Sequence, residues 1–285
     1  MAKKVPSFSF TGQYSSEMVG STWYIYLKST GTLTFTYAKR SVDVCVVGGG
    51  AGGGVVAAGK PGPGGGGGAV SNRTGIVIEA GVGQSITVGN GGGTASAGGA
   101  SSAFGVTSAG GAVNGGGVRG DGGPGGAGQN GTYAFGDTSL KRYGAGGGGG
   151  GDDKGNLGGA GGYDGGGNGG QGGRWDGNGA AATAGAANSG GGGGGEGKYL
   201  SSGDTQTSGG WPAPGGSGVV ILRGTEDDLL PVYFNGKQLS DIYFNGERVN
   251  SLIYGGVRVY ARRCKEWLLK RWACRSGFLK ATPAL

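Results

Sequence analysis

Glycine is concentrated in the middle of this 285-residue chain, and its placement limits what the chain can fold into. All but nine of the 80 glycines lie within residues 48–218, whereas glycine makes up roughly 7% of an ordinary domain. We call this segment the glycine field. Because it has few apolar side chains to bury, we expect a glycine-dominated, extended-backbone core rather than a hydrophobic one.

Residues 1–47 have the composition of β-strands and predict the N-terminal strands of a β-sandwich. β-Branched and aromatic residues dominate four predicted strands, at 8–10, 22–28, 32–37 and 42–47. Two more are predicted around a glycine-rich turn, at 75–79 and 84–88. The VVIL motif that opens residues 219–225 predicts a buried closing strand that pairs with the N-terminal strands. The glycine field is then an insertion whose two ends are held together.

The glycine field has two alternative interpretations, a disordered linker or a bundle of polyglycine-II helices. Gly/Ser linkers behave as coils, but the short sequences between the glycine runs carry aromatic and apolar residues. Collagen is excluded because residues 146–151 are all glycine and break any G-X-Y period. A polyproline-II-type helix has about three residues per turn and no internal hydrogen bonds, so glycine helices must bond to their neighbours. We expect this bundle, with the interruptions as turns at its ends.

The C-terminal part predicts a β-hairpin repeat module at 226–260 and a basic tail at 261–285. The motifs VYFNG, IYFNG and IYGG recur at spacings of ten and eleven residues, and Asn-Gly between strand-like residues is a strong hairpin signal. Residues 262–275 (RRCKEWLLKRWACR) predict a short amphipathic helix. The predicted fold is therefore all-β: a β-sandwich-like domain with an inserted polyglycine-II bundle, the hairpin module and a short C-terminal helix.

Composition argues against several functions. The chain has no histidine, which removes the commonest general base and metal ligand. Its three cysteines, Cys45, Cys264 and Cys274, support neither a disulfide framework nor a zinc site, and Cys45 is predicted to be a small buried residue. The net charge of +7 comes mainly from the C-terminal tail, for which a solvated or docking role is favoured over nucleic-acid binding. No apolar run is long enough to predict membrane insertion.

Several motifs in the glycine field resemble ligand sites without their structural context. Residues 42–53 (VDVCVVGGGAGG) match a dinucleotide fingerprint, and residues 54–60 match the start of a P-loop. Both motifs need a helix immediately afterwards, and the sequence GKPGPGGGGG cannot form one. The carboxylates of Asp152, Asp153, Asp164, Asp176 and Glu196 could bind calcium, but we interpret them as solvated turn residues. We therefore expect no cofactor and no metal.

The order of the motifs resembles the glycine-rich domain of bacteriophage tail proteins. The resemblance is carried by TWYIYLKSTGTLTFT, VDVCVVGGGAGGG, GQSITVGNGG, SSAFG and the closing GGSGVVILRG, and it covers most of residues 7–260. The VYFNGKQL and IYFNGERV repeats also look like the short C-terminal repeats of such proteins. The resemblance implies a virion component at a tail tip or fibre. It is also similar in kind to phage adhesins that present variable loops on polyglycine-II bundles, although their long fibre-attachment segment is missing.

These features predict a receptor-binding virion protein rather than an enzyme, made in the host cytoplasm and released by lysis. Its partners would be a bacterial surface glycan or protein and other tail proteins, and a homotrimer is a candidate assembly because trimers are common among fibres. The alternatives are a purely structural tail, capsid-fibre or decoration subunit, or a glycan depolymerase, for which no convincing pair of carboxylates is present. The receptor-binding candidates are aromatic and polar residues between the glycine runs: Tyr133, Phe135, Arg142, Tyr143, Tyr163, Arg174, Trp175, Asp176, Tyr199 and Trp211.

Overall fold

The computed structural model describes most of the chain up to residue 225 and short strands beyond it. The continuous described segments are 5–36, 40–57, 60–118, 125–152, 156–172, 180–200 and 206–225. Beyond them the structure describes the backbone of six strands between residues 233 and 283. Among these residues the only helical element is a single 3₁₀ turn, η1 (Ala134–Gly136). The all-β prediction is confirmed at this level.

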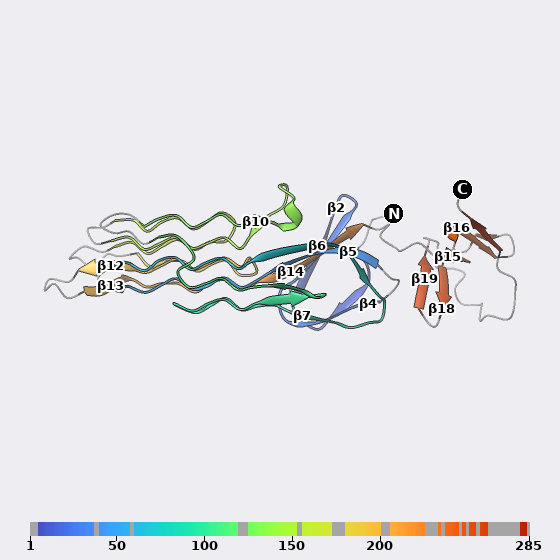
Figure 1. The fold of residues 1–285 in the computed structure, drawn as a ribbon, viewed down its shortest axis with the longest axis horizontal. Coiled ribbons are helices and arrows are strands. Elements are labelled where there is room, and N and C mark those ends of the chain that lie inside the picture. Colours follow the sequence, from blue (N-terminus) through green and yellow to red (C-terminus); the bar gives the residue numbers. More distant parts are fainter. Residues whose placement is uncertain are drawn as a thin grey trace.

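Two five-stranded sheets form the sandwich (Figure 1). In order across the first sheet, the strands are β1 (Phe8–Phe10), β4 (Gly31–Phe35), β7 (Gln84–Thr87), β8 (Ser101–Ala103) and β9 (Val106–Ser108). In the second they are β2 (Tyr14–Val19), β3 (Thr22–Leu27), β14 (Val219–Thr225), β5 (Arg40–Val47) and β6 (Val70–Ile78). Strand β14 lies between β3 and β5, with Leu222 opposite Ile25 on one side and Val44 on the other. The predicted pairing of the VVIL strand with the N-terminal strands is confirmed.

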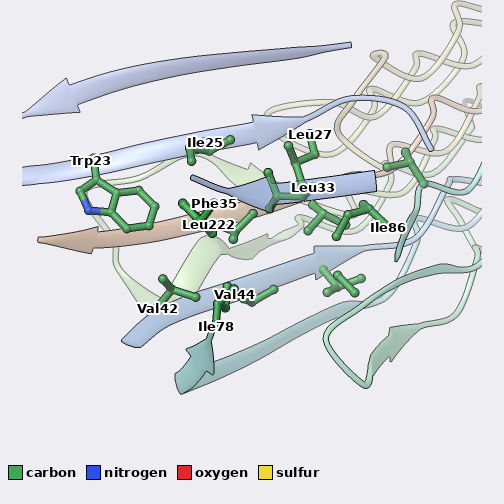
Figure 2. Packing of buried hydrophobic residues seen from close by; sticks show 14 residues of the cluster. Trp23, Ile25, Leu27, Leu33, Phe35, Val42, Val44, Ile78, Ile86 and Leu222 are labelled. Atoms are coloured by element: carbon green, nitrogen blue, oxygen red, sulfur yellow. The ribbon is translucent and has the colours of Figure 1, made fainter. Parts of the chain in front are cut away.

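A hydrophobic core fills the space between the two sheets, which corrects the expectation of a glycine core alone. Trp23, Ile25, Leu33 and Phe35 have no exposed surface, and Figure 2 shows how they pack with Leu222 of β14 and their neighbours. The Trp23 ring lies 6.2 Å from that of Phe35, edge to face. The alternating apolar residues of the strands therefore provide an ordinary sandwich core, and the glycine field is attached to it.

A second apolar cluster lies on the outer face of the β2–β6 sheet. Tyr24, Cys45 and Ile221 point away from the sandwich core, because side chains alternate between the faces of a strand. Residues 132–143 cover them with Ala134 and Tyr143. This segment folds as β10 (Thr132–Tyr133), η1 and β11 (Arg142–Tyr143), and β10 pairs with β11. The interruption between two glycine runs is therefore anchored to the sheet.

The strands predicted at 75–79 and 84–88 are present as the end of β6 and as β7, and they belong to different sheets. The edge strand β2 was not predicted. Its YSSEMV sequence is mostly exposed, and it lacks the β-branched and aromatic run that identifies a buried strand.

Extended runs of the glycine field leave the sandwich on one side (Figure 1). They are neither helix nor strand. The runs in the described residues are 48–54, 61–69, 89–93, 96–100, 109–112, 115–118, 125–131, 144–152, 156–162, 166–172, 180–186, 191–196 and 211–218. Their backbone N–H and C=O groups form hydrogen bonds mainly with other runs. These groups therefore have partners although the runs do not belong to a β-sheet.

The hydrogen bonds of run 48–54 repeat with a three-residue period. Each step of three along the run moves the acceptor back by three residues on the same neighbouring run. The donor–acceptor pairs on its three acceptor runs are Gly48–Ala69, Ala51–Gly66 and Gly54–Pro63; Gly49–Gly99 and Gly52–Ser96; and Gly50–Gly216 and Gly53–Ala213. Three successive amides therefore point to three different neighbours.

Interior runs are surrounded on all sides. The carbonyl groups of run 48–54 accept from three further runs, through the amides of Gly92, Gly111 and Gly193. Run 144–152 behaves in the same way. It donates to the runs at 61–69, 125–131 and 166–172, and it accepts from those at 115–118, 156–162 and 191–196. Backbone-to-backbone packing in every direction takes the place that side chains hold in an ordinary core.

Close approach between runs explains why the interior residues are glycine. A Cβ on Gly53 would overlap the carbonyl oxygen of Gly194, and one on Gly50 would overlap that of Gly191. In run 180–186, Ala181 and Ala184 are exposed, whereas Gly185 is buried against Gly191 and Gly216. Alanine also occurs inside the array, where Ala51, Ala145 and Ala213 are buried, so glycine is required at the positions of closest approach rather than at every inward position.

The strands beyond residue 225 form antiparallel pairs around the three repeated motifs. β15 (Tyr233–Phe234) and β17 (Glu247–Arg248) each pair with β16 (Lys237–Phe244), and β18 (Ser251–Tyr254) pairs with β19 (Val257–Ala261). β20 (Lys280–Pro283) also pairs with β16. The helix predicted at 262–275 lies outside the described residues. Within the described part of the chain, no helix has the length and apolarity that a membrane span requires.

Candidate functional site

The glycine runs have two ends, and the interruptions between them are divided between these ends (Figure 1). At the near end, β10, η1 and β11 lie against the sheet. At the far end, away from both sheets, are the paired strands β12 (Gly197–Leu200) and β13 (Gln206–Gly210). The candidates within the described residues are therefore distributed over two separate surfaces.

Three of the candidates meet at the near end. The guanidinium carbon of Arg142 lies 4.6 Å from the centre of the Tyr133 ring and 5.8 Å from that of Tyr163. Arg142 Nη2 also donates a 2.7 Å hydrogen bond to the Tyr133 hydroxyl. The Arg142 backbone amide donates to Asp164 Oδ2 at 3.2 Å, which ties the turn at 163–165 to β11. Tyr163 is 71% exposed, so it presents an aromatic face to solvent.

Phe135 and Tyr143 pack against the sheet. Tyr143 is buried, and this burial raises the pKa of its phenol to about 12. Phe135 adopts a left-handed φ of 55°, and its amide donates to Asn72 Oδ1 at 3.0 Å. The guanidinium of Arg223 lies 4.3 Å from the centre of the Phe135 ring. These contacts give both rings a structural role in fixing residues 132–143 on β5 and β14.

The far end exposes Trp211, whose side chain is 74% accessible directly after β13. Its carbonyl accepts a hydrogen bond from the Ala182 amide, which ties it to the run 180–186. The backbone of Tyr199 lies in β12, and its side chain is not described. Arg174, Trp175 and Asp176 lie outside the described residues.

Two acidic residues toward the far end are buried, which corrects their interpretation as solvated turn residues. Asp152 is 7% exposed and forms a 3.2 Å ion pair with Lys198. Glu196 is 4% exposed, and its Oε2 accepts a 2.7 Å hydrogen bond from the Val56 amide. Buried charges are costly unless they are paired or hydrogen-bonded, so these contacts fix the ends of neighbouring runs. Asp164 is exposed, as predicted.

The described residues offer little for a metal or nucleotide. They contain no group of three or more Cys, Asp or Glu side chains that could hold a metal ion. Gly48, Gly50 and Gly53 of the apparent dinucleotide fingerprint pack against the backbones of other runs. A pyrophosphate has no room there, and no helix follows within the described residues.

A polar pocket of about 340 Å³ lies on the outer face of the β2–β6 sheet, and no local sequence pattern indicates it. Asp43, Asp137 and Arg223 line it together with Tyr24. These residues come from β3, from β5, from the segment 132–143 and from β14, so only the fold brings them together.

Scans against protein-family models and against curated proteins find no match to this chain.

Proposed function

We propose that this chain is a virion protein of a bacteriophage tail tip or fibre, and that it binds the bacterial host surface through loops at the far end of a polyglycine-II bundle. The observation that carries the proposal is the exposure of Trp211 at the end of a backbone-bonded array of glycine runs. In such an array the far-end loops do not have to pack in the sandwich core. Their sequences can therefore change without loss of the fold.

The three-residue period supports the polyglycine-II assignment. A polyproline-II-type helix has about three residues per turn and forms no internal hydrogen bonds. In run 48–54, amides three residues apart donate to the same neighbour, and the acceptor also shifts by three. The six surrounding runs and the lack of room for a Cβ on Gly50 and Gly53 are what close packing of such helices requires.

The surroundings of the candidates favour the far end over the near end as the host-binding surface. At the near end, Phe135 and Tyr143 pack on the sheet, and Arg142 is held by Tyr133. Trp211, in contrast, is 74% exposed. An exposed tryptophan offers a large apolar face and one donor, which suits both sugar rings and protein surfaces.

The assembly partners follow from the resemblance to phage tail proteins. Other tail proteins would attach through the hairpin module or the basic tail, and a homotrimer is the candidate assembly. The alternative is a purely structural tail, capsid-fibre or decoration subunit. The packing of Phe135 and Tyr143 against the sheet favours this structural role for the near end, because the aromatic residues there stabilise the fold.

A cell-binding assay with two matched variants tests the proposal. Fluorescently labelled wild-type chain, Trp211→Ala and Tyr163→Ala would be titrated onto a panel of candidate bacterial host cells. Both residues are exposed aromatics, but Trp211 directly follows β13 at the far end, whereas Tyr163 lies against Arg142 of β11 at the near end. The proposal predicts saturable binding that Trp211→Ala weakens by about tenfold or more, as expected of a hot-spot residue, and that Tyr163→Ala leaves unchanged. Equal binding by all three proteins, or loss only in Tyr163→Ala, would refute the far-end site, and absence of binding would favour the structural subunit.

A further inference from the structure

The polar pocket on the outer face of the β2–β6 sheet has a defined arrangement of charges. Arg223 Nε lies 3.0 Å from Asp43 Oδ2, and Arg223 Nη1 lies 3.8 Å from Asp137 Oδ2. The guanidinium thus lies between two carboxylates. The side chains of Asp43 and Arg223 are about one quarter exposed and that of Asp137 is 39% exposed, so the charged groups border a cavity that is open to solvent.

The backbone positions each of the three groups. Asp43 lies at an irregularity in the pairing of β5 with β6, where its Oδ1 accepts a hydrogen bond from the Gly75 amide at 3.1 Å. Gly75 has a left-handed φ of 67°, which favours glycine at that position. Asp137 Oδ1 accepts from both the amide and the hydroxyl of Ser139, at 3.0 and 2.7 Å. Both carboxylates therefore keep their Oδ2 atoms on the side of Arg223.

The charges exclude several ligand classes. A divalent cation would have to occupy the space between the carboxylates, where the guanidinium of Arg223 already lies. An anion would meet Asp43 and Asp137, and the hydrogen bonds from Ser139 hold the pKa of Asp137 below its ordinary value, so that it stays ionised. An apolar ligand would displace water from the parts of these charged groups that face the cavity and would offer no hydrogen bond in return, at a cost in free energy.

We propose that this pocket binds one neutral pyranose ring of a saccharide. Each hydroxyl of such a ring both donates and accepts, which matches carboxylate acceptors alternating with guanidinium donors. The volume of about 340 Å³ is at the small end of the range of about 300–1,000 Å³ that is typical of ligand pockets, as a single ring requires. The site is separate from the far-end surface and does not depend on the function proposed for it.

Saturation-transfer-difference NMR tests this pocket directly. The probes are D-glucose, D-galactose and N-acetyl-D-glucosamine, with D-glucuronic acid as an anionic ring of similar size. The full chain is expected to transfer saturation to at least one neutral sugar and to bind glucuronic acid more weakly. Stronger binding of glucuronic acid, or no transfer to any neutral sugar, would overturn the proposal.

Two variants locate the binding. Asp137→Asn removes a pocket charge from a loop and is expected to weaken binding of the neutral sugar by about tenfold, the effect of losing one hydrogen bond to a charged group. Asp164→Asn is the matched control, because it changes an exposed aspartate of the near end that does not line the pocket. Near-UV circular dichroism checks that both variants keep the native fold. Equal affinity in Asp137→Asn and wild type, or equal weakening in both variants, would contradict binding in this pocket.

Discussion

The amide of Gly53 donates a 2.8 Å hydrogen bond to the carbonyl oxygen of Ala213, which lies in the last glycine run before β14. Three residues earlier, Gly50 donates to Gly216 in the same run. The first and last runs of the glycine field are therefore in direct contact. The field leaves the sheet at the end of β5 and returns at the start of β14, and these two strands are paired with each other. The antiparallel alignment of the two strands therefore continues into the first and last glycine runs.

Gly53→Ala is expected to destabilise the protein, whereas Gly93→Ala is expected to be nearly neutral. A Cβ on Gly53 would overlap the backbone of Gly194, which cannot move aside as a flexible side chain could. Gly93 has open space around the same position. Overpacking usually costs about 1–3 kcal/mol, and the rigid backbone neighbour places Gly53→Ala at the upper end of this range or above it. Chemical denaturation of both variants measures the difference, and equal stabilities would show that the runs are not closely packed.

Lys198→Met is expected to lower the free energy of unfolding by about 1.5–3 kcal/mol, because it removes the 3.2 Å ion pair that Lys198 forms with the buried Asp152 carboxylate. The side chains of this pair are only 13% and 9% exposed, so solvent screens this ion pair little. The exposed Asp164→Asn serves as the control and should change stability little. Thermal denaturation gives the comparison. If Lys198→Met left the stability unchanged, this end of the run would be open to water.

Cys45 is expected to be unreactive in the folded protein. It has no exposed surface, and burial raises the pKa of its thiol to about 12, which suppresses the reactive thiolate. A chain carrying Cys264→Ser and Cys274→Ser isolates this thiol for labelling with a disulfide reagent. Labelling should follow only after denaturant is added. Rapid labelling without denaturant would indicate that the outer apolar cluster is not formed.

Alkaline pH is expected to destabilise the fold through Tyr143. Its folded pKa of about 12 lies above the ordinary value of 10.0, so folding favours the protonated phenol. The stability that this difference provides is complete below pH 10 and is lost as the pH rises from about 10 to about 12. Unfolding curves at several pH values should show a smaller decline for Tyr143→Phe than for wild type, and identical declines would contradict the burial of this ring.

The sequence predicted the parts of the fold in which apolar side chains form a recognisable pattern. Residues 219–222 are four consecutive apolar residues, which identify a strand buried on both faces, and their pairing with β3 and β5 followed from the need to close the insertion. Cys45 was predicted as a buried residue for the same reason. Strand β2 was missed because an exposed edge strand has no comparable apolar pattern.

The candidate site was harder to predict because the sequence of a glycine run does not show how far the run extends. It also does not show at which end of the array the following turn lies. Tyr163 and Trp211 look alike in sequence, yet Tyr163 lies beside β11 at the near end and Trp211 directly follows β13 at the far end. Asp152 and Glu196 follow glycine runs, as exposed turn residues do, and only the packing of neighbouring runs buries them. The pocket at Arg223 depends on a segment 132–143 that folds back onto the sheet, a contact that no local pattern indicates.

Hydrogen exchange of individual backbone amides tests the central claim, that the glycine field is an ordered array of mutually bonded runs. The amide of Gly92 donates to the Gly50 carbonyl, whereas Gly93, the next residue, is exposed and its amide donates no bond within the described residues. In an isotope-labelled chain, Gly50, Gly53 and Gly92 should exchange far more slowly than Gly93. Exchange of all four amides at the rate of an unstructured chain would contradict the account and leave the glycine field as a linker.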